Sequence, residues 1–203
     1  NEHYMNAKLT YAHTENFKPY VRGAYNMRTY DNNPLRDNHG WEGVVGVEAD
    51  FGGITSLDFF AGWMQQYHDD YPVKKSVGTP RIGGRLDWNP TGLTSVVLEL
   101  DRTVEVTQIT DYNSFWQSGG SLTVTHELLR NVLLEATADY SFYDFIGAGS
   151  REDNLYSAGV GARYMINRSL YTDLFYNWDQ RTSTEAGVDY SRHMAIARVG
   201  VHF

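Results

Sequence analysis

The 203-residue sequence has no cysteine, only five prolines, no excess of basic residues and no long apolar run. The lack of cysteine excludes a disulfide framework, a thiol nucleophile and a thiolate metal site. No window approaches the roughly 18 uninterrupted apolar residues that a transmembrane helix needs, which excludes a helical membrane protein. Because 17 Lys and Arg stand against 25 Asp and Glu, giving a formal charge of −8, the sequence also argues against a nucleic-acid partner.

The remaining composition is that of a folded chain with many aromatic side chains. Hydrophobic residues make up 41% of the chain and charged residues 21%, proportions that argue against intrinsic disorder. Aromatic residues reach 14%, which is high for a water-soluble domain. The chain begins at Asn1 without the charged and apolar segments of a signal peptide. We therefore expect that a signal peptide has been removed or that the sequence is a fragment.

The dominant hydrophobic period is two residues, which is the period of a β-strand. In one segment Val96, Leu98 and Leu100 alternate with Glu99 and Asp101. Similar alternation recurs along the chain and predicts about eleven long antiparallel strands. They are expected at residues 3–13, 18–30, 40–51, 55–68, 79–88, 94–107, 114–126, 131–144, 153–166, 169–182 and 190–203.

The connections between these segments are expected to alternate in length. A unit of one hairpin and one long loop repeats about every 38 residues. Short turns are predicted at residues 15–17, 52–54, 90–92, 128–130 and 167–168, and longer polar loops at 31–39, 69–78, 108–113, 145–153 and 183–191. Two unlike rims are typical of an outer-membrane barrel, which has short periplasmic turns and longer external loops.

A soluble antiparallel sandwich or a lipocalin-like cup is the alternative fold. It predicts strands of about 5–6 residues and cannot tolerate unpaired charges on its buried face. Aromatic residues near the predicted strand ends instead favour the two girdles of a membrane barrel. They are Trp41, Phe51, Phe59, Tyr67, Trp88, Trp116, Tyr140, Tyr156, Tyr164 and Trp178.

The predicted fold is a transmembrane, antiparallel, up-and-down β-barrel, with residues 1–203 in one domain. Single-chain bacterial barrels have even strand numbers, whereas the pattern here gives an odd one. We therefore expect the chain to be the C-terminal part of a larger barrel, incomplete at its N-terminus. Its last residues, Val199–Phe203, resemble the C-terminal assembly signal of Gram-negative outer-membrane proteins, although Arg198 replaces the usual glycine.

Four segments resemble a known family: Arg81–Leu100, Thr125–Leu134, Gly159–Leu170 and Arg198–Phe203. They are similar to a family of outer-membrane β-barrel porins that occurs in α-proteobacteria and their relatives, often beside exopolysaccharide export genes. The combination W-N-P-T-x-L-T-x-V with the later H-E-L-L-R-N is the most specific part of this resemblance. It implies a barrel longer than this chain, with no catalytic residues to carry over.

Charged residues at alternate strand positions are expected to line the lumen. Acids predominate on even-numbered strands and bases on odd-numbered ones, so acids can reach bases across about 4.8 Å. Structural ion pairs explain this pattern more simply than a charged constriction that selects solutes, although the two are compatible. The predicted lumen-lining residues are Lys8, Arg22, Asp58, Arg81, Arg85, Glu99, Asp101, Glu135, Asp139, Arg163, Asp173 and Arg198.

No catalytic, cofactor or metal site is predicted. The seven histidines are scattered, and no HExxH, DxDxDG or GxSxG motif occurs. His39 and His68 are expected on external loops, where they could mimic a catalytic site at the rim, but solvated loop residues explain them better. The expected loop acids Asp69, Asp70, Glu152 and Asp153 could bind divalent cations, including ions that bridge to lipopolysaccharide phosphates, although their spacing does not support this.

Three functions remain open for this predicted barrel of the bacterial outer membrane. The leading hypothesis is a porin-like passive conduit for polar solutes, with exopolysaccharide as one candidate cargo. The second is a structural barrel with a closed lumen that anchors a periplasmic or surface partner, and the third is a hydrolase active at the rim. Expected partners are the lipid bilayer, lipopolysaccharide and proteins of an export complex. No enzymatic activity and no cofactor are expected.

Overall fold

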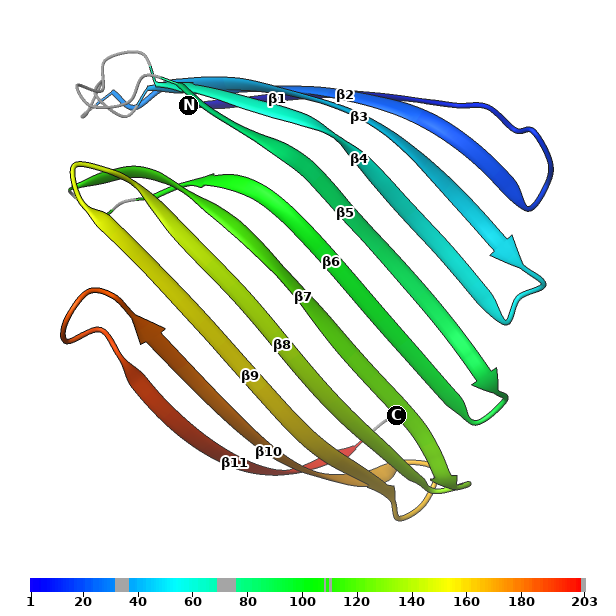
Figure 1. Cartoon of the computed structure of the whole chain (residues 1–203). Coiled ribbons are helices and arrows are strands. Elements are labelled where there is room, and N and C mark those ends of the chain that lie inside the picture. The colour runs from blue at the N-terminus through cyan, green and yellow to red at the C-terminus, as the bar shows by residue number, and fades with distance from the viewer. Residues whose placement is uncertain (32–36, 69–75, 108, 110, 202–203) are drawn as a thin grey trace.

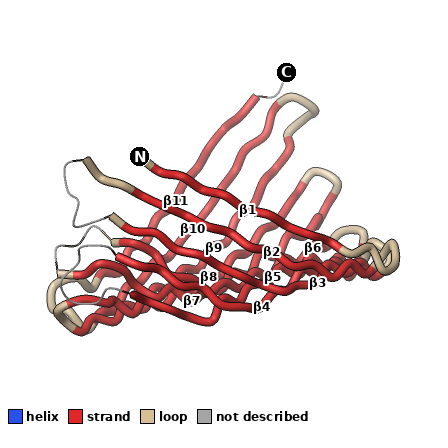
Figure 2. Tube along the Cα trace, turned by 90° about the horizontal axis from the view of Figure 1, so that it is seen from above, coloured by secondary structure: helices blue, strands red, loops and turns tan. Residues whose placement is uncertain are grey.

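The computed structural model describes residues 1–31, 37–68, 76–107, 109 and 111–201. These residues form eleven antiparallel strands in one sheet. The Cα trace is almost entirely strand, joined by loops at the two ends of the sheet (Figure 2). None of the residues described belongs to a helix long and apolar enough to cross a membrane.

Each strand pairs with its neighbour in sequence, so the sheet follows chain order (Figure 1). The curved sheet has β1 and β11 as its edges, and these two do not pair with each other within the described residues. This is the predicted all-β, up-and-down architecture. The strands are β1 Glu2–Thr10, β2 Phe17–Arg28, β3 Asn38–Phe51, β4 Thr55–His68, β5 Ser76–Thr91, β6 Thr94–Val106, β7 Tyr112–Leu129, β8 Val132–Gly147, β9 Ser150–Met165, β10 Leu170–Ser183 and β11 Tyr190–Val201.

We call the two ends of the sheet the turn rim and the loop rim. The turn rim carries the connections at residues 11–16, 52–54, 92–93, 130–131 and 166–169. The loop rim is the opposite end, which carries the connections 148–149 and 184–189 and the strand ends at Arg28, Asn38, His68, Ser76, Val106 and Tyr112. At the turn rim, Gly52 and Gly53 have φ angles of 72° and 75°, a backbone that favours glycine. The backbone N–H of Gly53 donates to the Asp50 carboxylate over 2.8 Å, which fixes this turn.

One predicted long loop is wrong. Residues 145–153 do not form a loop, because β8 continues to Gly147 and β9 starts at Ser150. The polar residues that suggested a loop are paired in strands instead, with Phe145 opposite Arg151 and Tyr143 opposite Asp153. The predicted loops at 31–39 and 69–78 fall largely outside the described residues, as does the terminal Phe203.

The two faces of the sheet have opposite character. Val44 is 4% exposed while its neighbour Val45 is 63% exposed, and Asp173 is 2% exposed while Leu174 is 59% exposed. One face therefore encloses charged side chains and the other presents apolar ones outward. This is the reverse of a water-soluble domain and the arrangement of a membrane barrel, whose outer surface meets lipid.

Apolar side chains from five strands pack together towards the loop rim. Val77, Val104 and Ile146 are each at most 5% exposed, and Met64 and Trp116 pack against them. The Thr103 hydroxyl also lies 3.5 Å from the Met64 sulfur, which links β6 to β4. Trp116, which was predicted to be a girdle residue, is thus partly buried by this cluster.

Candidate functional site: the charged face

The structure places all twelve predicted lumen residues on the same face of the sheet. Residues directly opposite each other in antiparallel strands point to the same side. The pairs Lys8–Arg22, Asp58–Arg85, Arg85–Glu99, Arg163–Asp173 and Asp173–Arg198 are opposite in this way, and the remaining residues share the face through the same alternation. We call this surface the charged face.

A first ion-pair cluster joins β2, β3, β5 and β6. Glu42 accepts from Arg22 over 3.1 Å and from Arg81 over 3.2 Å, and Arg81 also donates to Asp101 over 2.6 Å. The Arg22 and Arg81 guanidinium carbons lie 4.7 Å and 5.0 Å from the centre of the Phe60 ring. Two cations therefore share one ring and one carboxylate, and these contacts connect strands of the sheet that are not adjacent.

A second cluster lies closer to the turn rim. Lys8 pairs with Glu48, and its Nζ also lies 3.8 Å from the centre of the Tyr20 ring. Tyr20 is only 4% exposed, and its hydroxyl donates a hydrogen bond of 2.7 Å to the Asp58 carboxylate. Each polar group named in this paragraph thus has a partner on the charged face.

Arginines on β5 and β9 are held by carboxylates. Arg85 donates to Asp87 over 2.8 Å and also pairs with Glu99. Arg163 makes two hydrogen bonds, of 2.7 Å and 3.1 Å, to the buried Asp173 carboxylate. Such two-point contacts fix the orientation of a guanidinium as well as its position.

Four of the twelve predicted residues have no ion pair within the part of the chain that is described: Asp58, Glu135, Asp139 and Arg198. Arg198 instead lies 5.2 Å from the centre of the Phe175 ring. The charged face therefore combines neutralised pairs with groups whose charge is not offset locally.

Aromatic rings on this face pack against glycines of the next strand. A Cβ added to any of these glycines would overlap the ring. The pairs are Tyr20 over Gly46, Phe60 over Gly83, Phe175 over Gly161 and Tyr171 over Gly200. Each ring also has a cation within 3.8–5.2 Å of its centre: Lys8, Arg22 with Arg81, Arg198 and Arg163, respectively. Each of these four rings is therefore in contact with a glycine of the next strand and with a cation of the same face.

The sequence prediction missed an ion-pair network at the loop rim. Asp153 is fully buried and accepts from Arg151 over 3.0 Å and from Arg181, while Arg151 also pairs with Glu185 over 2.6 Å. Asp153 was expected on a loop, where it could bind divalent cations or bridge to lipopolysaccharide. Asp153 lies in β9, so the expected loop placement is wrong, and two arginines already neutralise its carboxylate. Arg151 and Asp153 are two residues apart, which is the period of a β-strand, so this spacing could have indicated that the strand includes them.

His39 and His68 lie in strands, so the prediction that both occupy external loops is wrong. His39 is the second residue of β3 and stacks on Tyr67, with ring centres 5.2 Å apart. His68 is the last residue of β4 and pairs with Asn38, so it points to the face opposite to that of His39. The two histidines cannot contribute to one catalytic site. Asp69 and Asp70 fall outside the described residues.

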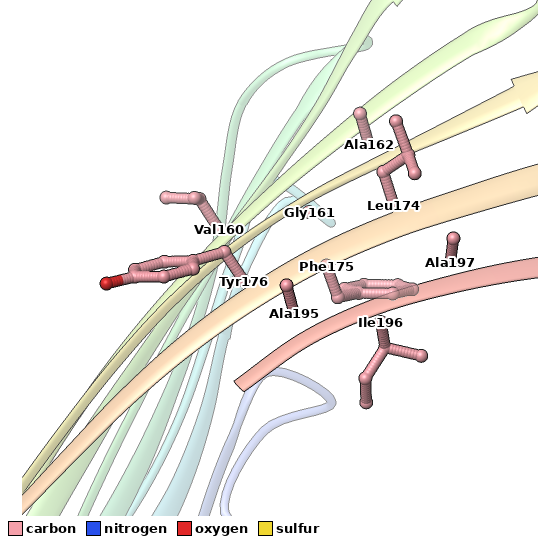
Figure 3. A pocket seen from close by; sticks show the side chains of 9 residues that line it. All are labelled: Val160, Gly161, Ala162, Leu174, Phe175, Tyr176, Ala195, Ile196 and Ala197. Atoms are coloured by element: carbon pink, nitrogen blue, oxygen red, sulfur yellow. The ribbon is translucent and has the colours of Figure 1, made fainter. Parts of the chain in front are cut away.

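A cavity of about 560 Å³ lies between β9, β10 and β11. It is lined mainly by alanines and apolar residues, and Ala162, Leu174, Ala195 and Ala197 project to one side of the sheet while Ile196 projects to the other (Figure 3). Leu174 belongs to the apolar face, so this hollow is suited to hydrocarbon rather than to a polar ligand. Within the described ranges, no group of three or more His, Asp or Glu residues could hold a metal ion.

Solved outer-membrane proteins share the fold. A variant of OmpT from Vibrio cholerae that lacks loop L8 matches with a TM-score of 0.51 and 13% identity, over 97% of this chain and 62% of that one. OmpT itself matches with a TM-score of 0.46 and 13% identity, over the same shares of the two chains. A FadL homologue of Pseudomonas aeruginosa matches with a TM-score of 0.41 and 10% identity, over 97% of this chain and 70% of that one. The chain thus spans less than two thirds of the length of OmpT. No protein of curated function matches it.

The match to a protein family covers the whole chain. The family model, described as "Putative beta-barrel porin 2", matches residues 1–203. Its barrel architecture agrees with the inverted faces of the sheet and with the sequential pairing of the strands. The chain therefore belongs to this family of β-barrel porins and is a protein of the bacterial outer membrane.

Proposed function

We propose that the protein is part of a passive conduit for polar solutes across the outer membrane, with the charged face lining the conduit. The observation that carries this proposal is that the enclosed face of the sheet holds charged side chains while the outward face presents apolar ones. A wall that encloses Asp173 and exposes Leu174 suits water on one side and lipid on the other. The proposal includes no catalytic step and no cofactor. The expected partners in the membrane are lipid and lipopolysaccharide.

The aromatic rings favour small polar solutes over a stacked carbohydrate chain. A passage that binds a sugar chain by stacking needs aromatic ring faces that are free to contact the sugar. Tyr20, Phe60, Tyr171 and Phe175 each contact a glycine of the next strand and have a cation within 3.8–5.2 Å of the ring centre, which leaves less of each ring free for a sugar. Exopolysaccharide, one candidate cargo, would therefore have to be recognised mainly by hydrogen bonds.

A barrel closed near the loop rim is the second candidate. The packed residues Val77, Val104 and Ile146, with Met64 and Trp116, favour it because they bring β4 to β8 together at that rim. Such a barrel would hold a partner protein, for example in an export complex, rather than conduct solutes.

Planar-bilayer recording distinguishes these two candidates. The purified protein should produce stable ohmic conductance steps if the charged face lines a water-filled passage. Triple substitution of Arg85, Arg163 and Arg198 by Gln should then shift the reversal potential in a salt gradient towards cation selectivity. Absence of any steps from correctly folded protein would contradict the conduit and support the closed barrel.

A further inference from the structure

A continuous row of polar residues crosses the charged face from β2 to β11. Each member lies directly opposite the next one on the neighbouring strand, and every member is either charged or a serine. The row consists of Lys18, Glu48, Asp58, Arg85, Glu99, Ser121, Asp139, Ser157, Asp179 and Arg192. No apolar side chain interrupts it, so it forms one uninterrupted polar path across ten strands.

This polar row begins at the turn rim of the sheet and ends at the loop rim. Lys18 is the second residue of β2, at the turn rim, whereas Arg192 is the third residue of β11, at the loop rim. Asp139 lies in the middle, as the eighth of the 16 residues of β8. Strands of membrane barrels are tilted by about 35–45°, so nine steps of about 4.8 Å across them rise by about 25–30 Å. That rise matches the apolar thickness of the membrane.

The charge along the polar row is predominantly negative. It has five carboxylates, three cations and two hydroxyls. Arg85 is held by two carboxylates, Asp87 and Glu99, and Arg192 donates to Asp179 over 2.7 Å. Asp139 has no ion pair among the described residues, so its charge is not offset. The ion pairs neutralise Arg85 and Arg192 together with Glu99 and Asp179, and Lys8, off the row, offsets Glu48. Among the described residues, Asp58 and Asp139 then stand against Lys18 alone, so the remaining charge of the row is negative.

Two cavities lie on the polar row, one towards each end. A cavity of about 270 Å³ near the turn rim includes Lys18, Glu48, Asp58 and Arg85 in its lining. A second, of about 160 Å³, is lined by Asp139, Ser157 and Asp179 together with neighbouring residues of β8 to β11. Space for a hydrated solute therefore occurs where the row approaches each rim.

We propose that the polar row is the path of permeating cations, from metal ions to small organic ammonium ions, along the inner wall. The carboxylates attract the cation, and the serine hydroxyls solvate it between charged positions. Low-dielectric walls strengthen such a potential and raise the local concentration of the attracted ion. This inference rests on the proposed conduit, because it assigns that conduit a preferred solute and a route.

The serines of the polar row allow a direct test. The chain has no cysteine, so Ser121→Cys and Ser157→Cys each introduce a single thiol on the row. The probes are a positively charged and a negatively charged methanethiosulfonate of similar size. The cationic reagent should modify each thiol at least about tenfold faster, the lower range of electrostatic steering, after correction for the reagents' rates on a free thiol. Equal corrected rates at both positions would overturn the path.

A matched pair of double variants tests whether the row itself causes the preference. In the Ser121→Cys background, Glu99→Gln with Asp139→Asn removes two charges from the row. Asp101→Asn with Glu135→Gln removes the same charges from the same strands and face, but off the row. The first pair should abolish most of the cation preference and the second should retain it. Equal effects of the two pairs would overturn the assignment to the row.

Conductance separates the failure of this inference from the failure of the conduit. A protein that conducts but labels without charge preference would overturn the cation path and leave the conduit in place. A folded protein that does not conduct would overturn the conduit and the path together.

Discussion

At the scale of single residues, the direction of a side chain decides its environment more than its chemical type does. Asp173 and Leu174 are adjacent in β10, yet the carboxylate is buried against Arg163 and the leucine is exposed on the other face. Buried charge is tolerated here because each such group has a partner within hydrogen-bonding distance. The cost of a substitution should therefore follow the face that it changes.

Leu98→Arg tests this relation on the apolar face. Leu98 lies opposite Leu86 and Leu122, so an arginine there would meet hydrocarbon. We expect a loss of about 2–4 kcal/mol in the free energy of unfolding, measured by urea titration of protein folded into lipid vesicles. The neighbouring Glu99→Gln should cost much less, because water can solvate the amide. Equal costs would mean that the faces are assigned one residue out of register.

Gly161→Ala tests the contact between glycine and ring. A Cβ at Gly161 would overlap the Phe175 ring, which is itself covered by Arg198 and cannot move without losing that contact. Overpacking of this kind should lower the free energy of unfolding by about 1–3 kcal/mol. Gly43→Ala is the control, since nothing lies within 4 Å of a Cβ there. A comparable loss at Gly43 would show that strand glycines matter for their backbone rather than for the ring above them.

At the scale of strands, the two-residue period predicted the elements well, because one face of each strand meets lipid and the other meets polar groups. All eleven predicted strands are present, with ends shifted by up to a few residues. The predicted loop at 145–153 failed because polarity alone does not distinguish a solvated loop from paired charges in a strand. There, Arg151 and Asp153 satisfy each other, so the strand continues.

The polar row could not have been predicted from the sequence. Alternation gives the face on which a residue lies, but not which residue it meets on the next strand. Turn lengths and bulges set that register, as the shift between Trp88 and Thr91 illustrates. Lys18 and Arg192 were therefore missed as members of one surface, although their alternation places them on the charged face.

Asp153→Ala should loosen the β9 and β10 ends at the loop rim. The substitution leaves Arg151 and Arg181 without the carboxylate that neutralises both, and loss of one partner from a buried pair costs about 3–5 kcal/mol. Hydrogen–deuterium exchange should accelerate at residues 150–153 and 181–185. Glu152→Ala is the control, because that side chain lies on the other face and is exposed. Unchanged exchange in Asp153→Ala would mean that backbone pairing alone holds this rim.

At the scale of the whole molecule, sequential pairing makes the two rims alternate along the chain. Every connection between an odd-numbered strand and the next one lies at the turn rim, and every other connection lies at the loop rim. Outer-membrane barrels keep short turns in the periplasm and longer loops outside. The polar row then runs from the periplasmic side at β2 to the external side at β11, so the orientation of the sheet sets the direction of the proposed path.

Epitope tags inserted at the two rims test this orientation. Gly187, in the connection 184–189, and Gly53, in the connection 52–54, both have open space around them, so either position should accept a short insertion. An antibody should label intact cells only when the tag follows Gly187, because that connection belongs to the loop rim. Both tags should be labelled once the outer membrane is permeabilised, which controls for expression and folding. Labelling of the Gly53 tag on intact cells would invert the orientation, and the negative path would then start outside the cell at β2.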